Sequence, residues 1–488
     1  MENRRWSEHA RAPSHGNSEP FSIKFHLFFA AEPFIIPSPV RARLNKTFMH
    51  FNEALRYLLS LGHETLAIKL GLRNIELLLS ALGNPERSYP AVQIAGTNGK
   101  GSTAVILDSI CHEAGIKTGL YTSPHLISIT ERIRIGGREI SPELFARHAT
   151  KVREAAERLL AGEITALPTF FEQVTAIALL AFRDEQVELG ILETGLGGRL
   201  DATSAAGATV VAITPIAFDH EEYLGQTLES IAAEKAAIIR PGSTAIISAQ
   251  TPQALEVIRR QCDLVGVEPE GDECKAHVES ATADGRLCVT LETSEDRYEN
   301  ITLGLRGRHQ VENTAVAIRL AESLRERGFG IPRTAIVAGV ANAVHPGRLE
   351  IWEGKPDFLF DGAHNPAGAQ ALRDYLNEFV QTPVTFVFGA MRDKKLEQMA
   401  ALLFPVASRV VLTTLDNPRS ASMGTLQSIA SGFIGPEKTF AASSVTDAIR
   451  IALEITPTDG LICVTGSLYL IGEVQAAAKQ TAQAEAAS

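Results

Sequence analysis

The chain has 488 residues, of which 45% are hydrophobic and 21% charged, and its net charge is −11. This length exceeds what one hydrophobic core usually holds, so we expect two or three domains of an ordinary soluble globular protein. The acidic balance, without a long basic run, argues against nucleic acid or an anionic membrane surface as the main partner. Positive charge for an anionic ligand must be concentrated locally, in segments such as MRDKK (Met391–Lys395).

The cysteines and the N-terminus bear on the cellular compartment. Five scattered cysteines without a CxxC pair indicate neither a zinc site nor a disulfide framework, and they favour a reducing cytoplasm. Residues 1–48 hold one apolar stretch, FHLFFAAEPFIIP, which Glu32 and Pro33 interrupt. That stretch is too short for a transmembrane helix and lacks a convincing secretory cleavage site. We expect Met49 to be the natural start, with residues 1–48 a disordered or spurious extension.

Apolar runs alternate with amphipathic segments after residue 48, which is typical of mostly parallel sheets flanked by helices. We therefore predict an α/β protein with domains over 49–344 and 345–477 and a flexible tail over 478–488. In the first domain the pattern predicts helices at Met49–Ser60, Leu72–Leu82, Pro142–Leu160, Phe170–Phe182, Leu228–Ile239, His309–Arg327 and Pro332–Ala343. It predicts strands at Lys117–Tyr121, Arg132–Ile135, Val187–Glu193 and Thr209–Thr214, and a small antiparallel unit between Cys274 and Leu303.

The second domain resumes the alternation after the turn HPGR (His345–Arg348), which we interpret as the hinge. Strands are predicted at Phe358–Asp361, Val384–Phe388, Arg409–Thr413 and Gly460–Thr465, and a helix at Pro366–Phe379. No internal repeat is visible.

The run AVQIAGTNGKGS (Ala91–Ser102) is the most informative stretch of the chain. It predicts a short strand, a glycine-rich turn and a helix, and such a turn directs successive backbone N–H groups toward bound phosphate. The match to the strict phosphate loop is imperfect, because Ile94 replaces a glycine and Gly101 displaces the hydroxyl of Ser102 by one place. The segment nevertheless predicts a nucleotide site at Gly96, Thr97, Asn98, Gly99, Lys100, Gly101 and Ser102.

This variant loop, GTNGKGS, resembles the ATP loop of the Mur ligase superfamily, and most closely that of its folate branch, the dihydrofolate and folylpolyglutamate synthases. Further stretches similar to that branch follow in the family's order: TSPHL, FFEQVTA, ETGLGGRLDAT, FDHEEYLG, AEKAAII, GRHQVENTAVAI, HPGR and DGAHNPAG. The resemblance implies a P-loop-type ATPase domain followed by a smaller Rossmann-like α/β domain. It also implies an ATP-dependent ligase that joins an amine to a carboxylate.

The reaction implied by the resemblance adds L-glutamate to dihydropteroate or to a folate in folate biosynthesis. ATP would phosphorylate the acceptor carboxylate, and the glutamate amine would attack the acyl phosphate. Bacterial members are often bifunctional and mostly monomeric, so we expect both activities in a cytoplasmic monomer.

The resemblance further implies a divalent metal held by Ser123 of TSPHL, Glu172 of FFEQVTA and His220 of FDHEEYLG. Oxygen ligands suit Mg²⁺, and a histidine leaves room for Mn²⁺. Taken alone, Glu172 would be a solvated helix residue and His220 a capped loop histidine. Lys235 of AEKAAII would be a lysine whose stem lies along an apolar helix face. In the resembled family this lysine is carbamylated by CO₂ and becomes an anionic metal ligand.

The remaining ATP-site residues also follow from the resemblance. Asp361 and His364 of DGAHNPAG would lie near the ribose and phosphates, with Arg348 reaching in from the hinge and Asn313 meeting the adenine. Asp361 and Asn365 would in any case serve as helix N-caps. Catalytic roles fall to Lys100, Lys235 and His364.

The acceptor substrate would meet TSPHL and the glycine-rich turn GLGGRLDAT. The residues implied are Ser123, Pro124, His125, Arg199 and Asp201. The alternative for the second segment is a plain strand-to-loop turn. Ser204 stands where many family members have asparagine. This departure lies in the region that the resemblance connects with the choice of acceptor substrate.

Three other function classes remain to be weighed. A Mur-type cell-wall ligase needs an N-terminal domain for a UDP-sugar, and the segment between Met49 and the ATP loop is too short for one. A P-loop phosphotransferase or NTPase explains Lys100 but leaves Lys235, HPGR and DGAHNP unexplained. A catalytically inactive binding protein is disfavoured because no candidate catalytic position is substituted.

Overall fold

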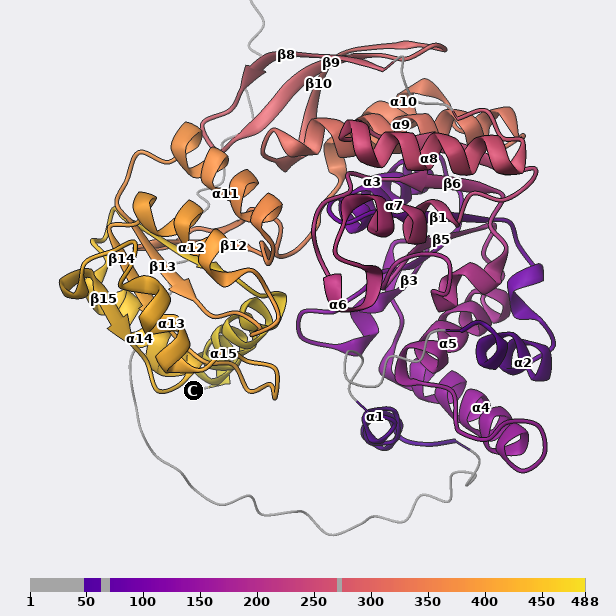
Figure 1. Cartoon of the computed structure of the whole chain (residues 1–488), viewed down its shortest axis with the longest axis horizontal. Helices are drawn as coiled ribbons and strands as arrows, with labels where there is room; N and C mark the ends of the chain where they lie inside the picture. Colours follow the sequence, from indigo (N-terminus) through magenta and orange to yellow (C-terminus); the bar gives the residue numbers. More distant parts are fainter. Residues whose placement is uncertain (1–47, 63–70, 270–273, 488) are drawn as a thin grey trace, which may run out of the picture.

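The computed structural model describes residues 48–62, 71–269 and 274–487, so the extension expected over 1–48 lies, apart from Phe48, outside the described residues. Figure 1 shows two lobes side by side, the first from α1 to α10 and the second from β12 to α15.

The first domain is built on a seven-stranded sheet in the order β4-β3-β2-β5-β1-β6-β7. The strands are β1 (Ala91–Ala95), β2 (Thr118–Tyr121), β3 (Ile133–Ile135), β4 (Arg138–Glu139), β5 (Leu189–Glu193), β6 (Val210–Ile213) and β7 (Thr244–Ile247). Strands β1, β2, β5, β6 and β7 run parallel, while β3 and β4 form an antiparallel edge. The carboxyl ends of the parallel strands therefore meet at one edge, where α/β proteins bind ligands.

Helices cover both faces of this sheet. One face carries α3 (Lys100–Glu113), α9 (His309–Glu326) and α10 (Arg333–Asn342). The other carries α1 (Phe51–Ser60), α2 (Arg73–Ala81), α4 (Pro142–Leu160), α5 (Phe170–Asp184), α7 (Leu228–Ala236) and α8 (Pro252–Val265). Side chains alternate along β1, so Val92 and Ile94 face the α3 layer while Ala91 and Ala95 face the opposite one. Both faces are therefore apolar and buried.

The second domain has a six-stranded sheet in the order β11-β12-β16-β13-β14-β15, parallel except for the edge strand β11. Its strands are β11 (Glu350–Trp352), β12 (Asp357–Asp361), β13 (Val384–Phe388), β14 (Arg409–Leu412), β15 (Thr439–Ala441) and β16 (Leu461–Thr465). Its helices are α11 (Pro366–Phe379), α12 (Leu396–Leu403), α13 (Met423–Ala430), α14 (Val445–Ile455) and α15 (Leu468–Ala487).

A small antiparallel sheet of β8 (Lys275–Ala281), β9 (Arg286–Glu292) and β10 (Arg297–Arg306) joins the two domains. It lies over α9 and α10 and reaches toward α11 (Figure 1). The Tyr375 hydroxyl of α11 donates to the carbonyl oxygen of Asp284 in the β8–β9 turn at 2.9 Å. The antiparallel unit predicted from the sequence is thereby confirmed, and it contacts both domains.

The predicted α/β class with mainly parallel sheets is confirmed. The pattern missed β4, β7, α6 (Glu221–Leu224) and α8 in the first domain, and β11, β15 and α12 to α15 in the second. Helix α15 continues to Ala487, through most of the segment that we expected to be a flexible tail, and its alanine-rich sequence favours a helix.

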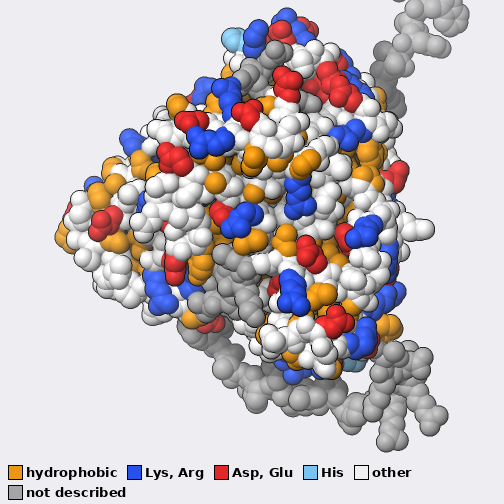
Figure 2. Space-filling model, turned by 45° about the vertical axis from the view of Figure 1, so that its right-hand side comes forward, with side chains coloured by type: hydrophobic (Ala, Val, Ile, Leu, Met, Phe, Trp, Pro, Cys, Tyr) orange, Lys and Arg blue, Asp and Glu red, His pale blue; other side chains and the backbone are white. Residues whose placement is uncertain are grey.

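Two surface properties bear on partners. No helix within the described ranges is long and apolar enough to cross a membrane. On the face drawn in Figure 2, acidic and basic side chains are interspersed rather than gathered into a field of one sign. Among the described residues of this face, no field of basic side chains stands out.

Helices α3 and α10 approach so closely that only glycine fits at Gly339, where a Cβ would lie 2.3 Å from the Ile110 Cα atom. We predict that Gly339→Ala lowers the free energy of unfolding by about 1–2 kcal/mol, because overpacking outweighs the gain of about 0.5–1 kcal/mol in helix propensity. Thermal unfolding measures the effect. Gly330→Ala, at a position with no atom within 4 Å of the added Cβ, is the control. Equal midpoints for the two variants would contradict the packing argument.

Candidate active site

A cleft of about 480 Å³ lies between the two domains. Its walls include segments that follow the carboxyl ends of strands in both sheets, as expected for α/β proteins. The first domain supplies residues 96–102, Ser123, Glu172, Glu193, Asp201, Asp219, His220, Lys235 and Asn313, and the hinge and second domain supply Arg348, 361–364, Lys394, Arg419 and 466–469.

The glycine-rich loop between β1 and α3 is shaped by two close approaches. Gly96 and Gly99 have positive φ angles, of 151° and 87°. A Cβ at Gly99 would lie 2.1 Å from Asn313 Oδ1, and one at Gly96 would lie 1.9 Å from Thr214 Oγ1. Both positions require glycine for conformation and for space. Asn313, itself buried, therefore packs directly on the loop.

Only part of the loop has backbone N–H groups available for phosphate. Those of Thr97 and Asn98 donate to the carbonyl oxygen of Pro215, at 3.0 and 3.2 Å. The expectation that the whole turn directs its N–H groups toward phosphate is thus wrong for these two residues. The first bond of α3 runs from the Thr103 N–H to the Gly99 carbonyl. The N–H groups of residues 100–102, at the positive end of α3, remain for an anion because a helix offers them no internal acceptor.

Lys100 stands at the start of α3 on the cleft wall. Its ammonium donates to the Thr97 carbonyl at 3.1 Å. Burial lowers the pKa of Lys100, and the nearby carboxylates of Glu193 and Asp219 oppose that shift. The lysine is therefore held between the loop and two acids.

Glu193, the last residue of β5, is a site residue that the sequence analysis did not select. It is buried, and its Oε2 accepts the Ser123 N–H at 3.0 Å. A Cβ at Gly101 would lie 3.3 Å from the same oxygen, so the carboxylate faces the first turn of α3. Burial raises the pKa of Glu193 and Lys100 lowers it. Its position at the end of a buried parallel strand was the signal that could have found it.

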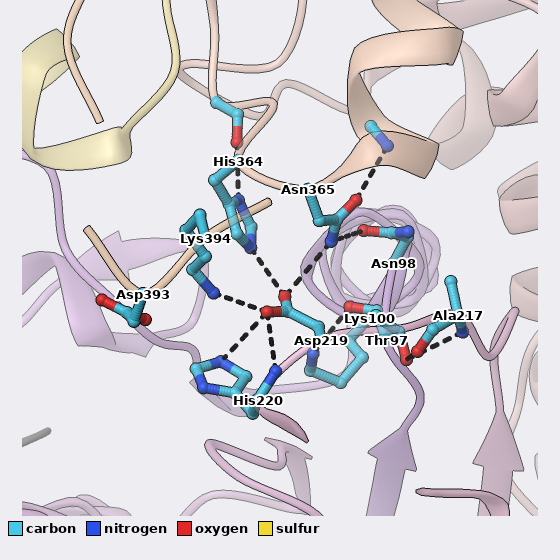
Figure 3. Close-up of polar contacts among 12 residues, drawn as sticks. Thr97, Asn98, Lys100, Ala217, Asp219, His220, His364, Asn365, Asp393 and Lys394 are labelled. Carbon is cyan, nitrogen blue, oxygen red and sulfur yellow. Dashed lines mark hydrogen bonds and ion pairs between the residues drawn. The ribbon is translucent and has the colours of Figure 1, made fainter. Parts of the chain in front are cut away.

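Asp219, which follows β6, is the centre of the polar network drawn in Figure 3. Lys394 Nζ lies 2.5 Å from its Oδ1, and both side chains are more than 90% buried. Its Oδ2 lies 3.3 Å from His364 Nε2 and accepts the Asn365 amide at 3.2 Å. The backbone N–H of His220 also donates to Oδ1, at 2.9 Å. These cationic and hydrogen-bonding partners hold the pKa of Asp219 well below its usual range although burial opposes them.

Two residues of the second domain extend this network to the ATP loop and to their own helix. Asn365 donates to Asn98 Oδ1 at 3.0 Å and, through its own Oδ1, accepts the Gly368 N–H that begins α11. His364 turns Nδ1 toward the Gly362 carbonyl at 2.8 Å. The phosphate loop, Asp219 and the start of α11 are thus connected side chain to side chain.

His220 has a left-handed backbone, with φ of 52°, and begins the short helix α6 (Glu221–Leu224). Burial, and then the positive charge of Lys394, lowers the pKa of His220 to about 3. Its imidazole is neutral at physiological pH, the form that binds a metal ion.

Lys235, on α7, points toward the same loop. It is buried, and its Nζ donates to the Gly96 carbonyl at 2.6 Å. Burial, with a contribution from Lys100, lowers the pKa of Lys235 to about 7. A lysine snorkelling to solvent is therefore excluded.

Comparison with known proteins agrees with this geometry. Residues 94–321 match the Mur ligase middle domain, and residues 347–468 match the Mur ligase glutamate ligase domain. The dihydrofolate synthase/folylpolyglutamate synthase of Bacillus subtilis is 33% identical over 419 residues, which is 85% of this chain and 96% of that protein. The chain belongs to the dihydrofolate synthase/folylpolyglutamate synthase family. It is accordingly an ATP-dependent glutamate ligase.

Solved structures of the family superpose closely. The Mycobacterium tuberculosis folylpolyglutamate synthase complexed with ADP has a TM-score of 0.82 and 32% identity, covering 88% of this chain and 98% of that one. A bifunctional folylpolyglutamate synthase/dihydrofolate synthase with Mn, AMPPNP and L-glutamate bound has a TM-score of 0.76 and 29% identity, covering 89% and 99%. The chain spans half the length of a Haloferax volcanii relative, a probable bifunctional folylpolyglutamate synthase/dihydropteroate synthase that is 35% identical over 88% of this chain.

Three residues predicted for the acceptor site of this ligase have other partners. Arg199 forms an ion pair with Glu234 at 2.8 Å, and His125 accepts from Arg132 Nε at 2.8 Å; neither Arg199 nor His125 is among the residues that line the cleft. Asp201 lies on the cleft wall, but its carboxylate organises the glycine-rich turn. It accepts N–H groups of residues 195, 196 and 203 and the hydroxyl of residue 203. Ser123 and Pro124 do line the cleft.

The predicted residues of the second half of the ATP site come together at the hinge. Asp361 accepts the N–H groups of Leu349 and Ala363, each at 3.0 Å. Burial raises the pKa of Asp361, and the adjacent Arg348 guanidinium opposes this. A Cβ at Gly362 would lie 2.2 Å from Arg348 Nη1, so Arg348 packs directly against the DGAH turn. Its positive charge faces the cleft.

Two carboxylates lie near Ser123 and His220 on the cleft wall, Glu172 and Glu193. Glu172 closes a capping box at the start of α5, with its Oε2 accepting the Thr169 N–H at 2.7 Å. The carboxylate that accepts the Ser123 N–H is that of Glu193, and we therefore favour Glu193 for the metal. Among the described residues, no group of three or more His, Cys, Asp or Glu side chains is placed to hold a metal. A set of one hydroxyl, one carboxylate and one imidazole fits a cation that takes its other ligands from phosphate and water, as Mg²⁺ does.

We predict that Glu193→Gln raises the Mg²⁺ or Mn²⁺ concentration for half-maximal activity about tenfold or more, since weakening even an indirect ligand typically costs that much. Glu172→Gln is the matched control, because glutamine also serves in a capping box and should leave the metal response unchanged. Metal titrations of activity decide between the two carboxylates. A raised metal requirement in Glu172→Gln, with a normal one in Glu193→Gln, would contradict the assignment.

Proposed function

We propose that this ligase adds L-glutamate both to dihydropteroate and to tetrahydrofolate, each through an acyl phosphate intermediate. One observation carries the proposal: the phosphate loop of the first domain and the DGAHNP turn of the second meet at Asp219 across a single cleft. Several family members bear names with both activities. A cleft that holds the acceptor carboxylate beside the ATP phosphates suits both acceptors, which differ in what extends beyond the reacting carboxylate.

In the first step the acceptor carboxylate attacks the γ-phosphorus of ATP and ADP leaves. The first-turn N–H groups of α3 and Lys100 bind the phosphate oxygens, and Arg348 and Lys394 supply positive charge from the opposite wall. Mg²⁺ bound through Ser123, Glu193 and His220 would supply further neutralisation of the phosphates. Asn313, which packs on the loop, would contact the adenine.

In the second step the neutral amine of L-glutamate attacks the acyl carbon, and phosphate departs as the amide forms. Water must be excluded until then, because it would hydrolyse the acyl phosphate. The side-chain contacts across the cleft, from Lys394 and Asn365 to Asp219, hold the two domains together over the reacting groups. Their separation would release the products.

Carbamylation of Lys235 is part of the proposal. The buried amine lies beside the loop carbonyl of Gly96 and has a pKa of about 7, so a large part of it is neutral at physiological pH. The neutral amine is the form that reacts with CO₂. The carbamate would change a cation into an anion next to Lys100, which would relieve the repulsion between the two lysines and provide oxygen ligands for a second metal ion.

We predict that metal-free protein in ¹³C-bicarbonate shows a carbamate signal that is stronger at pH 8 than at pH 6, since an amine of pKa about 7 is roughly 90% neutral at the first and 10% at the second. Carbon NMR measures the signal. Lys235→Ala should lose both the signal and turnover, without rescue by excess bicarbonate. The same signal in Lys235→Ala, or substantial retained activity, would refute the role.

The proposed function is tested by mass spectrometry of the products formed with ATP, Mg²⁺ and L-glutamate. Dihydropteroate and tetrahydrofolate are offered in separate reactions, and each should gain glutamyl units as ADP appears. Extension of only one acceptor would remove the other activity from the proposal. ADP formation without a glutamate requirement would point to an NTPase instead.

A further inference from the structure

Two consecutive lysines of the second domain contact the segment that carries His220. Lys394 pairs with Asp219, as described above. Lys395, at the start of α12, lies 2.6 Å from Glu221 Oε1, and its Nζ stands 4.4 Å from the centroid of the Phe218 ring. We call these contacts of Lys394 and Lys395 with residues 218–221 the clasp. Residues on both sides of His220 are thereby bound by the opposite domain.

The two ion pairs of the clasp differ in their exposure. Lys394 and Asp219 are almost fully buried, whereas Lys395 and Glu221 keep about a third of their side-chain surface exposed, 34% and 28%. A buried pair must be complete, because either charge alone would be strongly destabilising. The partly exposed pair of Lys395 and Glu221 contributes less to the contact between the domains. Either residue can be changed without leaving an unpaired buried charge. It is therefore the part of the clasp that mutation can probe.

The backbone between the two pairs is in an uncommon conformation. His220 has φ of 52°, which costs free energy for a residue with a Cβ and persists only where surrounding contacts hold it. Within the first domain, the His220 N–H donates to Asp219 Oδ1, and the His220 carbonyl accepts the N–H groups of Tyr223 and Leu224. Lys394 and Lys395 of the other domain hold the residues on either side of it. The second domain thus adds contacts to the turn on both sides of His220.

We propose that Lys395 and Glu221 are positioning residues. Their ion pair fixes the turn 218–221 when the domains close, and so brings the His220 imidazole into its metal-binding position only in the closed enzyme. This inference deepens the proposed function and rests on it, since His220 has a metal to hold only in the ATP-dependent reaction. It gives the ligase a means of assembling the metal site after both domains have met over the nucleotide.

A charge swap tests the proposal with Glu221→Lys, Lys395→Glu and the double variant. Each single reversal places like charges together, and we expect it to raise the Kd for Mn²⁺ in the presence of AMPPNP about fivefold. The double variant brings opposite charges together again, so we expect it to regain at least part of the lost Mn²⁺ affinity. Electron paramagnetic resonance measures the bound Mn²⁺. Solution X-ray scattering should show a larger radius of gyration for each single variant than for the double. Thermal unfolding establishes that all three variants are folded.

The matched control is the same swap at Glu256 and Arg260, an exposed ion pair on α8 remote from the cleft, which should change neither readout. A double variant that binds Mn²⁺ no better than the weaker single variant would overturn the clasp. Neither readout requires turnover, so the two proposals can fail separately. If the wild type makes no glutamylated product and the swap pattern still appears, the proposed function falls and the clasp stands. If the wild type is active and the pattern is absent, the clasp alone falls.

Discussion

The site depends on one buried carboxylate. Asp219 belongs to the first domain, but its countercharge, Lys394, and two further partners, His364 and Asn365, come from the second. A carboxylate this deeply buried is stable only with compensating charge and hydrogen bonds, and so is the ammonium of Lys394. The closed arrangement of the domains therefore satisfies both groups at once. Separation of the domains would expose both groups to water.

The topology explains how these residues meet. Asp219 follows β6, His364 and Asn365 follow β12, and Lys394 follows β13, so each stands beyond the carboxyl end of a parallel strand. The two sheets direct these ends toward the same cleft. Asn365 then connects the network to Asn98 of the phosphate loop. The phosphate loop, the segment that carries His220 and the start of α11 are thus linked through contacts of one or two side chains.

Local patterns predicted much of this and failed at identifiable points. The strand–turn–helix unit around Gly99 follows from neighbouring residues, so the sequence was sufficient there, whereas the close approach of Asn313 to Gly99 was not visible in the pattern. Neighbouring residues could not show whether Glu172 or Glu193 belongs to the metal site. Both are acids at the end of an element, and only their hydrogen-bond partners distinguish them. Glu172 accepts the N–H of Thr169, the N-cap of its own helix, whereas Glu193 accepts the N–H of Ser123 in the segment that follows β2.

The sequence pattern could not predict contacts between residues that lie far apart in the chain. Lys394 and Asp219 are 175 positions apart, and MRDKK alone indicated only a local excess of positive charge. Likewise, Arg199 and His125 lie in segments that resemble the family's substrate-binding motifs, yet the first pairs with Glu234 and the second with Arg132. The motif places a segment near the cleft, and packing decides which of its side chains enter.

Hydrogen exchange in Asp219→Asn tests the central claim most directly, because it reports on both walls of the cleft at once. If Asp219 holds the domains together over the ATP loop, the nucleotide-free variant will exchange faster than the wild type in residues 96–102 and in residues 361–368, while β1 and β16 keep their protection. Faster exchange confined to residues 217–221, or none, would show that the domains meet without this carboxylate and would contradict the account.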